Sequence, residues 1–328
     1  MKYIVTGGAG FIGHNVVHQL EAMGHTCYVL DSGTDYGFVP EEELKYLLSE
    51  RKKKFKSTVH NIDIRNAGAV ELFFRGCLNV DAVIHLASFP RQKVVTQDPV
   101  WGAEVMGTAL VNLLEQTKKN NIPKFVYISS SMVYGDFEDD VSEGELCQPQ
   151  GQYAIMKYMG EQLVRDYSIN QHAFDHVIIR PSAVYGKLDV EDRVVSKFIL
   201  TAMRGGELQV NGCNEILDFS HVEDVAAGIE LAATLSAANN KTYNITRSSD
   251  QTCTLEQAAR LIIDLVGSGT IAINDRESGY PTRGRLCIDR AVKDLGYAPA
   301  IDIEEGFQRY YNWFKKSTYW QKNLNRGN

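Results

Sequence analysis

The segment Thr6-Gly7-Gly8-Ala9-Gly10-Phe11-Ile12-Gly13 decides the fold of this chain. An apolar stretch over residues 2–6 precedes it, and residues 11–23 have the pattern of a helix. A strand, a glycine turn and a helix in this order let the backbone approach a pyrophosphate, and the helix start offers free N–H groups to the phosphates. The segment therefore predicts a dinucleotide-binding loop.

The spaced glycines of this loop have separate expected tasks. Gly7 makes the tight turn, Gly10 lets the chain come close to the pyrophosphate, and Gly13 lets the helix pack on the strand. Phe11 and Ile12 complete the first helical turn beside the phosphates. Taken alone, the segment also allows an ordinary strand–turn–helix with no ligand.

Two acidic residues at strand ends extend the expected site. The stretch 27–30 ends in Asp31, about twenty residues after the loop, where a carboxylate accepts hydrogen bonds from the adenosine ribose and repels a 2′-phosphate. This position favours NAD over NADP, although a helix cap or turn residue would look the same. The stretch 58–62 ends at Asp63 and Ile64, which we expect to contact the adenine.

The first 180 residues alternate between apolar strands and helices. This alternation predicts an α/β fold, a doubly wound parallel sheet of the Rossmann type, with an NAD-binding domain over residues 1–180. The expected strands are 2–6, 27–30, 58–62, 81–86, 124–129 and 176–180, and the main expected helices between them are 66–75, 100–119 and 152–169.

The pattern loosens after Arg180, where residues 181–328 are expected to form a smaller α/β lobe for a substrate. The segment 215–246 is expected to return to the first domain, since an alanine-rich helix and a strand over 242–245 follow Asp218-Phe219. The polar tail from Lys316 is expected to be mobile. The helices expected in this half are 192–204, 223–236, 254–266 and 303–315.

Composition and charge describe an ordinary globular protein. The chain has 328 residues, of which 44% are hydrophobic and 23% charged, enough for a large core and two domains. A net charge of -7 argues against nucleic acid as a partner. The basic run Arg51-Lys52-Lys53-Lys54 is interpreted as a solvated helix face.

The cysteines and the N-terminus bear on the expected compartment. The six cysteines are scattered without a C-x-x-C pair, which favours free thiols in a reducing compartment and gives no metal site. No apolar run approaches the ~18 residues that a membrane span needs. Because the chain starts directly in a strand, a signal peptide is not expected, and we expect a cytoplasmic protein without membrane attachment.

A second group of residues has the side chains needed for proton transfer. Tyr153 and Lys157 are four residues apart on an expected helix, so both project from one face. A nearby ammonium and the positive nicotinamide ring favour the phenolate, which lets Tyr153 take a hydroxyl proton as catalytic base. Ser130, after the strand that ends in serines, would hydrogen-bond the same hydroxyl. A surface Tyr–Lys pair is the alternative, and the dinucleotide loop upstream argues against it.

These motifs together resemble the extended short-chain dehydrogenase/reductase family, in particular its nucleotide-sugar epimerase/dehydratase group. The glycine spacing G-x-x-G-x-x-G of residues 7–13 is the variant of this family, and the resemblance covers nearly the whole chain. Further marks are Asp31, Asp63, His85-Leu86-Ala87-Ser88, Gly107-Thr108, Ser129–Gly135, Tyr153–Lys157, Arg180-Pro181, Val184-Tyr185-Gly186, Asp218-Phe219 and His221-Val222-Glu223-Asp224.

The resemblance implies tightly bound NAD, a nucleoside-diphosphate sugar as substrate, and a homodimer packed through helices 100–119 and 152–169. It also implies a role in carbohydrate metabolism, often polysaccharide biosynthesis. The cofactor set that it implies is Gly7, Gly10, Phe11, Ile12, Gly13, Asp31, Asp63, Ile64, Leu86, Ala87, Ser88, Tyr153, Lys157 and Pro181.

The substrate set combines the resemblance with placed charges. Arg283 resembles a family arginine that grips the diphosphate, with a solvent-exposed loop arginine as the alternative. Arg91 and Lys93 follow a strand towards the sugar, while Arg193 and Lys197 add charge on a helix beside the pocket. Ser131 and Met132 complete the set next to Ser130.

Two positions in the serine segment narrow the reaction. The dehydratases carry two acids where this chain has Ser131 and Met132, and the decarboxylases carry a glutamate in place of Met132. Serine and methionine cannot do that acid–base work, so dehydration is not expected. The serine form is similar to the epimerases, which oxidise C4 to a ketone, rotate the sugar and return the hydride to the other face.

Three further positions depart from the family pattern. Glu104 and Ala183 stand where asparagines are common, and Leu217 stands where an arginine usually contacts the diphosphate. These changes leave the identity of the sugar nucleotide open.

The expected function is therefore an NAD-dependent nucleotide-sugar epimerase acting at C4 through a transient 4-keto intermediate. A nucleotide-sugar 4-dehydrogenase or 4-keto reductase, an oxidoreductase with net redox change, is the enzymatic alternative. A non-catalytic dinucleotide sensor is the alternative from another class, although the complete set of Ser130, Tyr153 and Lys157 speaks against it.

Overall fold

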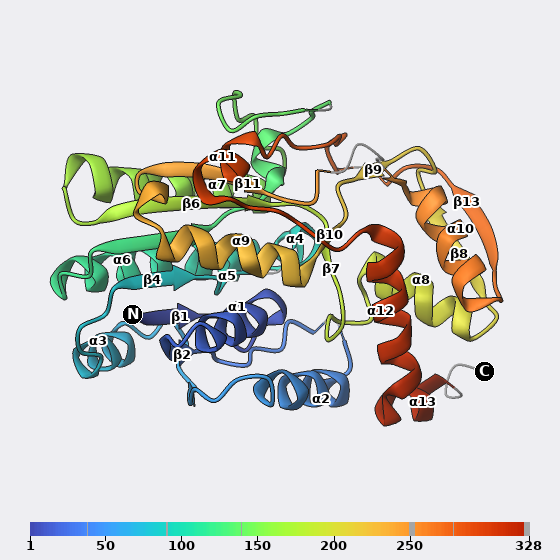
Figure 1. The fold of residues 1–328 in the computed structure, drawn as a ribbon, viewed down its shortest axis with the longest axis horizontal. Coiled ribbons are helices and arrows are strands. Elements are labelled where there is room, and N and C mark those ends of the chain that lie inside the picture. Colours follow the sequence, from blue (N-terminus) through green and yellow to red (C-terminus); the bar gives the residue numbers. More distant parts are fainter. Residues whose placement is uncertain (38, 90, 139, 249–252, 278, 325–328) are drawn as a thin grey trace.

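A seven-stranded parallel sheet forms the centre of the molecule in the computed structural model, which describes residues 1–37, 39–89, 91–138, 140–248, 253–277 and 279–324 (Figure 1). The strand order is β11-β6-β5-β4-β1-β2-β3. These strands are β1 (Lys2–Thr6), β2 (Thr26–Leu30), β3 (Val59–His60), β4 (Ala82–His85), β5 (Lys124–Ile128), β6 (Asp175–Pro181) and β11 (Lys241–Ile245). The predicted doubly wound α/β fold is confirmed.

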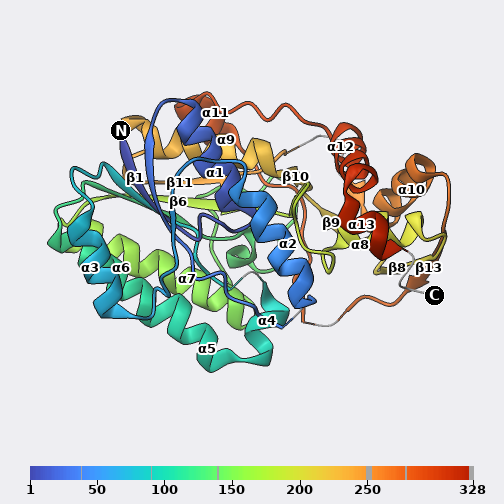
Figure 2. The same ribbon diagram turned by 90° about the horizontal axis from the view of Figure 1, so that it is seen from below.

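Helices cover both faces of this sheet (Figure 2). Apolar residues point to both sides of the strands, as a parallel sheet buried on both faces requires. One face carries α1 (Phe11–Ala22), α9 (Val222–Thr234) and α11 (Asp289–Leu295), and the other carries α3 (Ala67–Gly76), α6 (Ala109–Lys119) and α7 (Gln152–Arg165).

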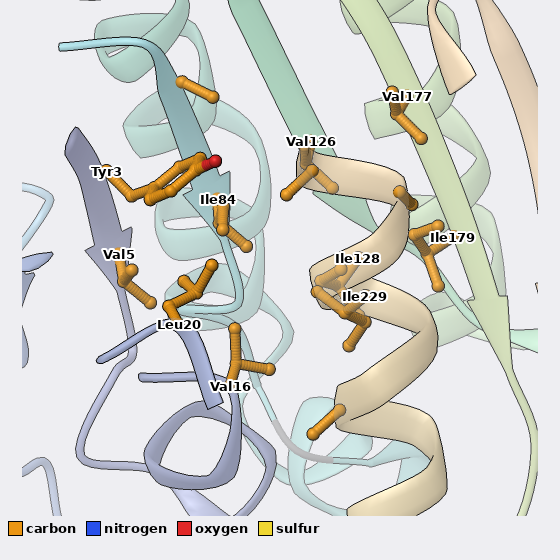
Figure 3. Packing of buried hydrophobic residues seen from close by; sticks show 14 of the residues in the cluster. Tyr3, Val5, Val16, Leu20, Ile84, Val126, Ile128, Val177, Ile179 and Ile229 are labelled. Carbon is orange, nitrogen blue, oxygen red and sulfur yellow. The ribbon is translucent and has the colours of Figure 1, made fainter. Parts of the chain in front are cut away.

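The first of these faces shows how the helices are held. Val16 and Leu20 of α1 and Ile229 of α9 pack against Val5 and Ile84 of the sheet, all fully buried (Figure 3). Burying an aliphatic side chain of this size contributes about 1.5–3 kcal/mol. This packing fixes the start of α1, and with it the glycine loop, at the carboxyl end of β1.

The strand order reverses between β1 and β4, because β1 pairs with β2 on one side and with β4 on the other. In open parallel sheets, ligands bind beyond the carboxyl ends of the strands at such a switch point. Those strand ends carry Gly7, Asp31, Leu86 and Ser129.

A smaller lobe packs beyond these strand ends (Figure 1). Its core is formed by α8 (Val194–Met203), α10 (Leu255–Val266), α12 (Ile303–Lys316) and α13 (Thr318–Asn323). Short strand pairs complete it: β8 (Glu207–Asn211) with β13 (Thr270–Asn274), and β9 (Ile216–Leu217) with β12 (Cys253–Thr254). A further pair, β7 (Val184–Tyr185) with β10 (Ser220–His221), lies where the two parts meet.

The chain returns twice from the lobe to the large sheet. After β9 and β10, α9 covers the sheet and β11 pairs with β6 as an edge strand. A later return, which the sequence pattern does not predict, places Ala291 and Leu295 of α11 in the same core.

Several helices differ from the sequence expectation. The expected helix 100–119 is split into α5 (Pro99–Ala103), a π-helical turn over Glu104–Thr108 and α6, and it follows the short α4 (Gln92–Gln97). The expected helix 152–169 ends as α7 and continues as a π-helical turn over Asp166–Asn170. Apolar periodicity does not separate one helical hydrogen-bond pattern from another.

The expectation of a mobile tail from Lys316 is wrong for its first part. Residues 318–323 form α13, and Trp320 is buried with only 1% of its surface exposed. One large aromatic residue is enough to dock a polar segment.

Helix α2 (Glu41–Lys52) is a further element that the sequence pattern leaves out. Its buried residues are Glu43, Leu47 and Arg51, one per turn of the same face. The interpretation of the basic run as a solvated face is therefore wrong for Arg51, which is only 4% exposed. Among the described helices, none has the length and apolar character needed to cross a bilayer.

Candidate active site

The glycine loop lies where β1 turns into α1. Gly7 has a φ of +71°, and a Cβ there would lie 2.6 Å from the backbone nitrogen of Ala87. A Cβ at Gly13 would lie 2.1 Å from the carbonyl oxygen of Gly7. Side chains are thus excluded where the backbone must stay open, and the first N–H groups of α1 have no partner within the helix. This bare cradle fits the pyrophosphate of a dinucleotide.

Asp31 follows β2 directly and braces the same loop. Its Oδ2 accepts the N–H of Ala9 at 2.9 Å, and its Oδ1 accepts the N–H of Gly33 at 2.8 Å. Asp31 is therefore a turn residue, as the alternative interpretation held. Each carboxylate oxygen keeps a lone pair for a further donor, so the ribose role remains compatible with this geometry.

A cavity of about 600 Å³ runs from the glycine loop to the small lobe. This volume lies in the range of small-molecule sites. Every cofactor, catalytic and substrate residue predicted from the sequence lines it, with the exception of Lys93 and Lys197. Lys93 is exposed on α4, and the Lys197 side chain is 56% exposed and paired with Asp192 at 2.8 Å.

Ser130, Tyr153 and Lys157 meet at the carboxyl end of β5. Ser130 lies beside the Tyr153 phenol, on whose pKa it acts, and its hydroxyl accepts the N–H of Met132 at 3.2 Å. Lys157 Nζ donates to the carbonyl of Ile128 at 2.8 Å and lies 5.9 Å from the Tyr153 ring centre. The strand end thus fixes both the serine and the lysine around one phenol.

Burial and nearby charges shift the pKa values of the groups around this phenol. Burial raises the pKa of Tyr153, and the Arg193 guanidinium and the Ser130 hydroxyl act in the other direction. Burial also lowers the pKa of Lys157 to about 7, although the Glu161 carboxylate acts in the other direction. Arg193 is thus a cation that acts on the Tyr153 phenol, and the expected effect of Lys157 beside bound NAD stays a prediction.

The neighbouring serines have structural partners. Ser129 donates to Glu161 at 2.7 Å, and Glu161 is held by Arg180 through bonds of 2.9 and 2.7 Å, all of them buried. Ser131 donates to Ser182 at 3.1 Å. Of this triplet, Ser130 is the serine that acts on the pKa of the Tyr153 phenol.

His85 is packed rather than catalytic. Its Nδ1 lies 2.7 Å from the Thr6 hydroxyl, and the side chain is 3% exposed. Burial and the Lys157 charge lower the pKa of His85 to about 3, so it stays neutral at physiological pH.

The substrate end of the cavity contains arginines. Arg91 forms an ion pair with the Asp192 carboxylate and donates to the Asp192 carbonyl at 2.7 Å. Arg193 lies 3.9 Å from Asp189. Arg283 Nη1 is 4.0 Å from Met132 Sδ, and among the described residues its shielded Nε has no hydrogen-bond partner. Arg283 therefore lines the cavity instead of pointing to solvent.

The three departures from the family pattern have identifiable surroundings. Glu104 forms an ion pair with Arg65 at 3.0 Å, and Arg65 also pairs with Asp63 at 2.7 Å. Ala183 has a φ of +33°, a region that asparagine tolerates better than alanine. Leu217 lines the cavity with an apolar side chain.

Several lining residues were missed from the sequence. Arg51, Gln92, Asp189 and Tyr280 come from α2, α4 and loops with no motif of their own. Arg51 stands near the end of α2 within a basic run, a pattern that indicates a solvated helix face and gives no sign of a cavity residue. Among the described residues, no group of three or more His, Cys, Asp or Glu side chains is placed to hold a metal ion.

Comparisons with known proteins agree with this geometry. The model of the "NAD dependent epimerase/dehydratase family" matches residues 3–246. A putative UDP-glucose 4-epimerase of Methanocaldococcus jannaschii is 29% identical over 96% of this chain and 98% of its own length. The UDP-glucuronate 4-epimerase of Thermodesulfobacterium geofontis is 28% identical, over 96% of each chain.

A solved structure gives the same result at the level of the fold. The crystal structure of UDP-glucuronic acid 4-epimerase from Bacillus cereus, in complex with UDP-glucuronic acid and NAD, superposes with a TM-score of 0.86. It is 25% identical, and the match covers 96% of this chain and 99% of that one.

Proposed function

The chain belongs to the NAD dependent epimerase/dehydratase family, and from this premise we propose that it is an epimerase of a nucleoside-diphosphate sugar, acting at C4 through a transient 4-keto sugar. The protein is an NAD-dependent enzyme. The observation that carries the proposal is that Ser130, Tyr153 and Lys157 line one cavity together with the glycine loop.

The residues of this chain have distinct roles in the proposed reaction. NAD, when bound, supplies reversible hydride transfer at a sugar carbon. Tyr153 removes and returns the proton of the C4 hydroxyl, and Ser130 holds the same oxygen by a hydrogen bond. Lys157 is fixed by the Ile128 carbonyl, and Arg193 lowers the pKa of the phenol.

The cofactor end of the cavity is proposed to hold the dinucleotide along the predicted set. Gly10, Phe11 and Ile12 would hold the pyrophosphate, Asp31 would hold the ribose, and Asp63 and Ile64 would contact the adenine. The nicotinamide end is bounded by residues 86–88 and by Pro181. In this proposal the large sheet, residues 1–180 with the return over 215–246, binds NAD, and the small lobe binds the sugar nucleotide.

The absence of acids beside Ser130 favours epimerisation over elimination of water. Ser131 is bonded to Ser182, and Met132 is buried with 7% of its surface exposed. Neither side chain can donate and accept a proton across a carbon–carbon bond. Arg283 and Arg193 are proposed to bind the diphosphate in place of the arginine that Leu217 replaces.

The assembly and setting follow from the same proposal. Exposed apolar side chains occur on adjacent helices: Val100 on α5, Val111 on α6, and Ile155 and Met159 on α7, between 36% and 70% exposed. We propose that this face forms a homodimer. We propose further that the enzyme is cytoplasmic and supplies sugars for polysaccharide biosynthesis.

The experiment is to incubate the purified protein with a panel of UDP-, dTDP-, GDP- and CDP-sugars and to identify products by NMR. We expect one C4 epimer pair to equilibrate with no net change in absorbance at 340 nm. Tyr153→Phe should lower kcat by about 10²–10⁴-fold, because it removes the general base. The NAD content of the variant should stay that of the wild type.

Two results would contradict the proposal. Stoichiometric NADH formation or consumption with a sugar substrate would indicate a dehydrogenase or reductase. Substantial epimerase activity in Tyr153→Phe would exclude the phenol as the base.

A further inference from the structure

Helix α2 holds the loop between β7 and α8 through a buried arginine. Nε and Nη2 of Arg51 both donate to the carbonyl of Leu188, at 3.0 and 2.7 Å. Leu188 is buried and has a φ of +71°, a conformation that leucine adopts only under constraint. The two bonds from Arg51 supply such a constraint.

A second side chain of the same helix holds the next turn of the loop. Oε1 of Glu43 accepts the N–H of Glu191 at 2.7 Å, and Glu43 is 1% exposed. Glu43, Leu47 and Arg51 lie four residues apart and therefore share one face of α2. The loop is thus fixed at two points by one rigid element.

The segment held in this way carries residues of the active-site cavity. Asp192 forms an ion pair with Arg91. Arg193, which precedes α8, lines the cavity together with Tyr153. A shift of the backbone at 188–191 would move both side chains. Arg193 is also the cation that lowers the pKa of Tyr153.

Helix α2 also contacts the cofactor end of the cavity. A Cβ at Gly33 would lie 3.4 Å from Leu48 Cδ1, and the N–H of Gly33 is bonded to Asp31. The carboxylates of Asp31 and Asp189 both act on the Arg51 guanidinium, which lines the cavity. One helix therefore contacts both halves of the site.

We propose that Arg51 and Glu43 are positioning residues, which clamp segment 188–193 and so place Arg193 and Asp192 for the sugar nucleotide. The clamp can be measured directly, through the amide exchange of residues 188–193. The part of the proposal that concerns the substrate rests on the proposed function, whereas the clamp does not.

The test uses the full chain with its bound NAD and three variants of α2. Arg51→Met and Glu43→Leu remove the clamp contacts, and Glu43→Gln retains one. Hydrogen–deuterium exchange measures the amides of residues 188–193. Loss of one or two buried hydrogen bonds should speed exchange there by about tenfold in Arg51→Met and Glu43→Leu. Glu43→Gln keeps an acceptor oxygen and should exchange like the wild type.

Lys45→Met is the matched control. Lys45 lies on the exposed side of the same helix, with 72% of its side chain accessible, and pairs only locally with Glu41. Its exchange over 188–193 and its kinetics should be those of the wild type.

Kinetics separate a positioning role from general support of the fold. With the sugar nucleotide that the panel identifies, Arg51→Met and Glu43→Leu should raise KM by about tenfold and shift the pH profile of kcat to higher pH, because Arg193 is proposed to bind the diphosphate and also favours the Tyr153 phenolate. Glu43→Gln should restore the wild-type KM.

The clamp is overturned if exchange over 188–193 is unchanged in both Arg51→Met and Glu43→Leu, or if Glu43→Gln exchanges as fast as Glu43→Leu. Faster exchange without any rise in KM would refute the positioning role. If no sugar nucleotide is turned over, the proposed function fails while the exchange measurement still decides the clamp.

Discussion

Ser129, Ser130 and Ser131 are adjacent and chemically identical, yet their hydroxyls have different partners. Ser129 is bonded to a buried ion pair, Ser130 lies beside the Tyr153 phenol, and Ser131 is bonded to Ser182. Strand β5 ends at Ile128, Ser130 has an extended backbone, and Ser131 begins a 3₁₀ turn, so the three side chains leave the backbone in different directions. Local backbone conformation, rather than residue type, therefore decides which serine lies beside the phenol.

Glu43 shows how one buried acid makes folding sensitive to pH. Burial raises the pKa of Glu43 to about 7, and the nearby carboxylates of Glu191 and Asp189 add to this rise. Between about pH 4.5 and 7 the folded protein holds a proton that the unfolded chain has lost. The contribution of Glu43 to the free energy of unfolding therefore falls as pH rises through this window.

Glu43→Gln should remove this fall, because glutamine does not titrate. Relative to the wild type, the variant should gain on the order of 2–3 kcal/mol of unfolding free energy between pH 4.5 and 7.5. Urea unfolding at a series of pH values measures the difference. A difference between the two proteins that stays constant across the series would show that Glu43 does not titrate there.

At the scale of single elements, the turn from β1 into α1 depends on a missing side chain. A Cβ at Gly13 would lie 2.1 Å from a backbone oxygen, and backbone cannot move aside without displacing the loop. Gly13→Ala should therefore lower the unfolding free energy by about 1–3 kcal/mol and release NAD.

The thermal midpoint and the NAD content after gel filtration measure both effects of Gly13→Ala. Gly68→Ala is the control, because Gly68 lies in helix α3 and a Cβ there meets only Asn66 Oδ1 at 3.8 Å. That control should be neutral or slightly stabilising. Retention of NAD in Gly13→Ala would contradict the assigned role of the loop.

Elements with a regular apolar pattern and a glycine turn at their boundary could be predicted from the sequence. Helix α2 could not. The strands of the large sheet read as apolar runs, and the glycine turn and the Tyr–Lys spacing carry their chemistry in residue type. In α2, by contrast, two of the three buried residues are charged, so apolar periodicity gives no signal. Arg51 and Asp189 enter the cavity only because the fold pairs distant segments.

The same reason explains the two lysines that the cavity excludes. Lys93 and Lys197 stand next in sequence to lining residues, but helical rotation turns them outwards into solvent. Nearness along the chain predicts the region of a site and does not predict which side of a helix faces it.

At the scale of the whole molecule, the proposed dimer requires that α6 and α7 are buried between two copies of the chain. Val111→Glu and Met159→Glu add charge to the exposed apolar face, which should shift the protein from dimer to monomer at micromolar concentration. Sedimentation velocity measures this shift. Val292→Glu on α11 is the control, since Val292 is 49% exposed and α11 covers the opposite face of the sheet.

A wild-type protein that sediments as a monomer would contradict the proposed dimer. Dissociation by Val292→Glu as well as by Val111→Glu would show that the added charge acts wherever it is placed, and not through the proposed interface.

The two returns of the chain to the large sheet bear on synthesis in the cell. One face of the sheet receives α9 and then Ala291, Leu295 and Tyr297, which come from the last fifth of the chain. A nascent polypeptide therefore leaves the ribosome with this face partly bare until those residues emerge. Chaperones that bind exposed apolar surface would have their longest opportunity there, and premature termination before residue 290 would leave a product marked for proteolysis.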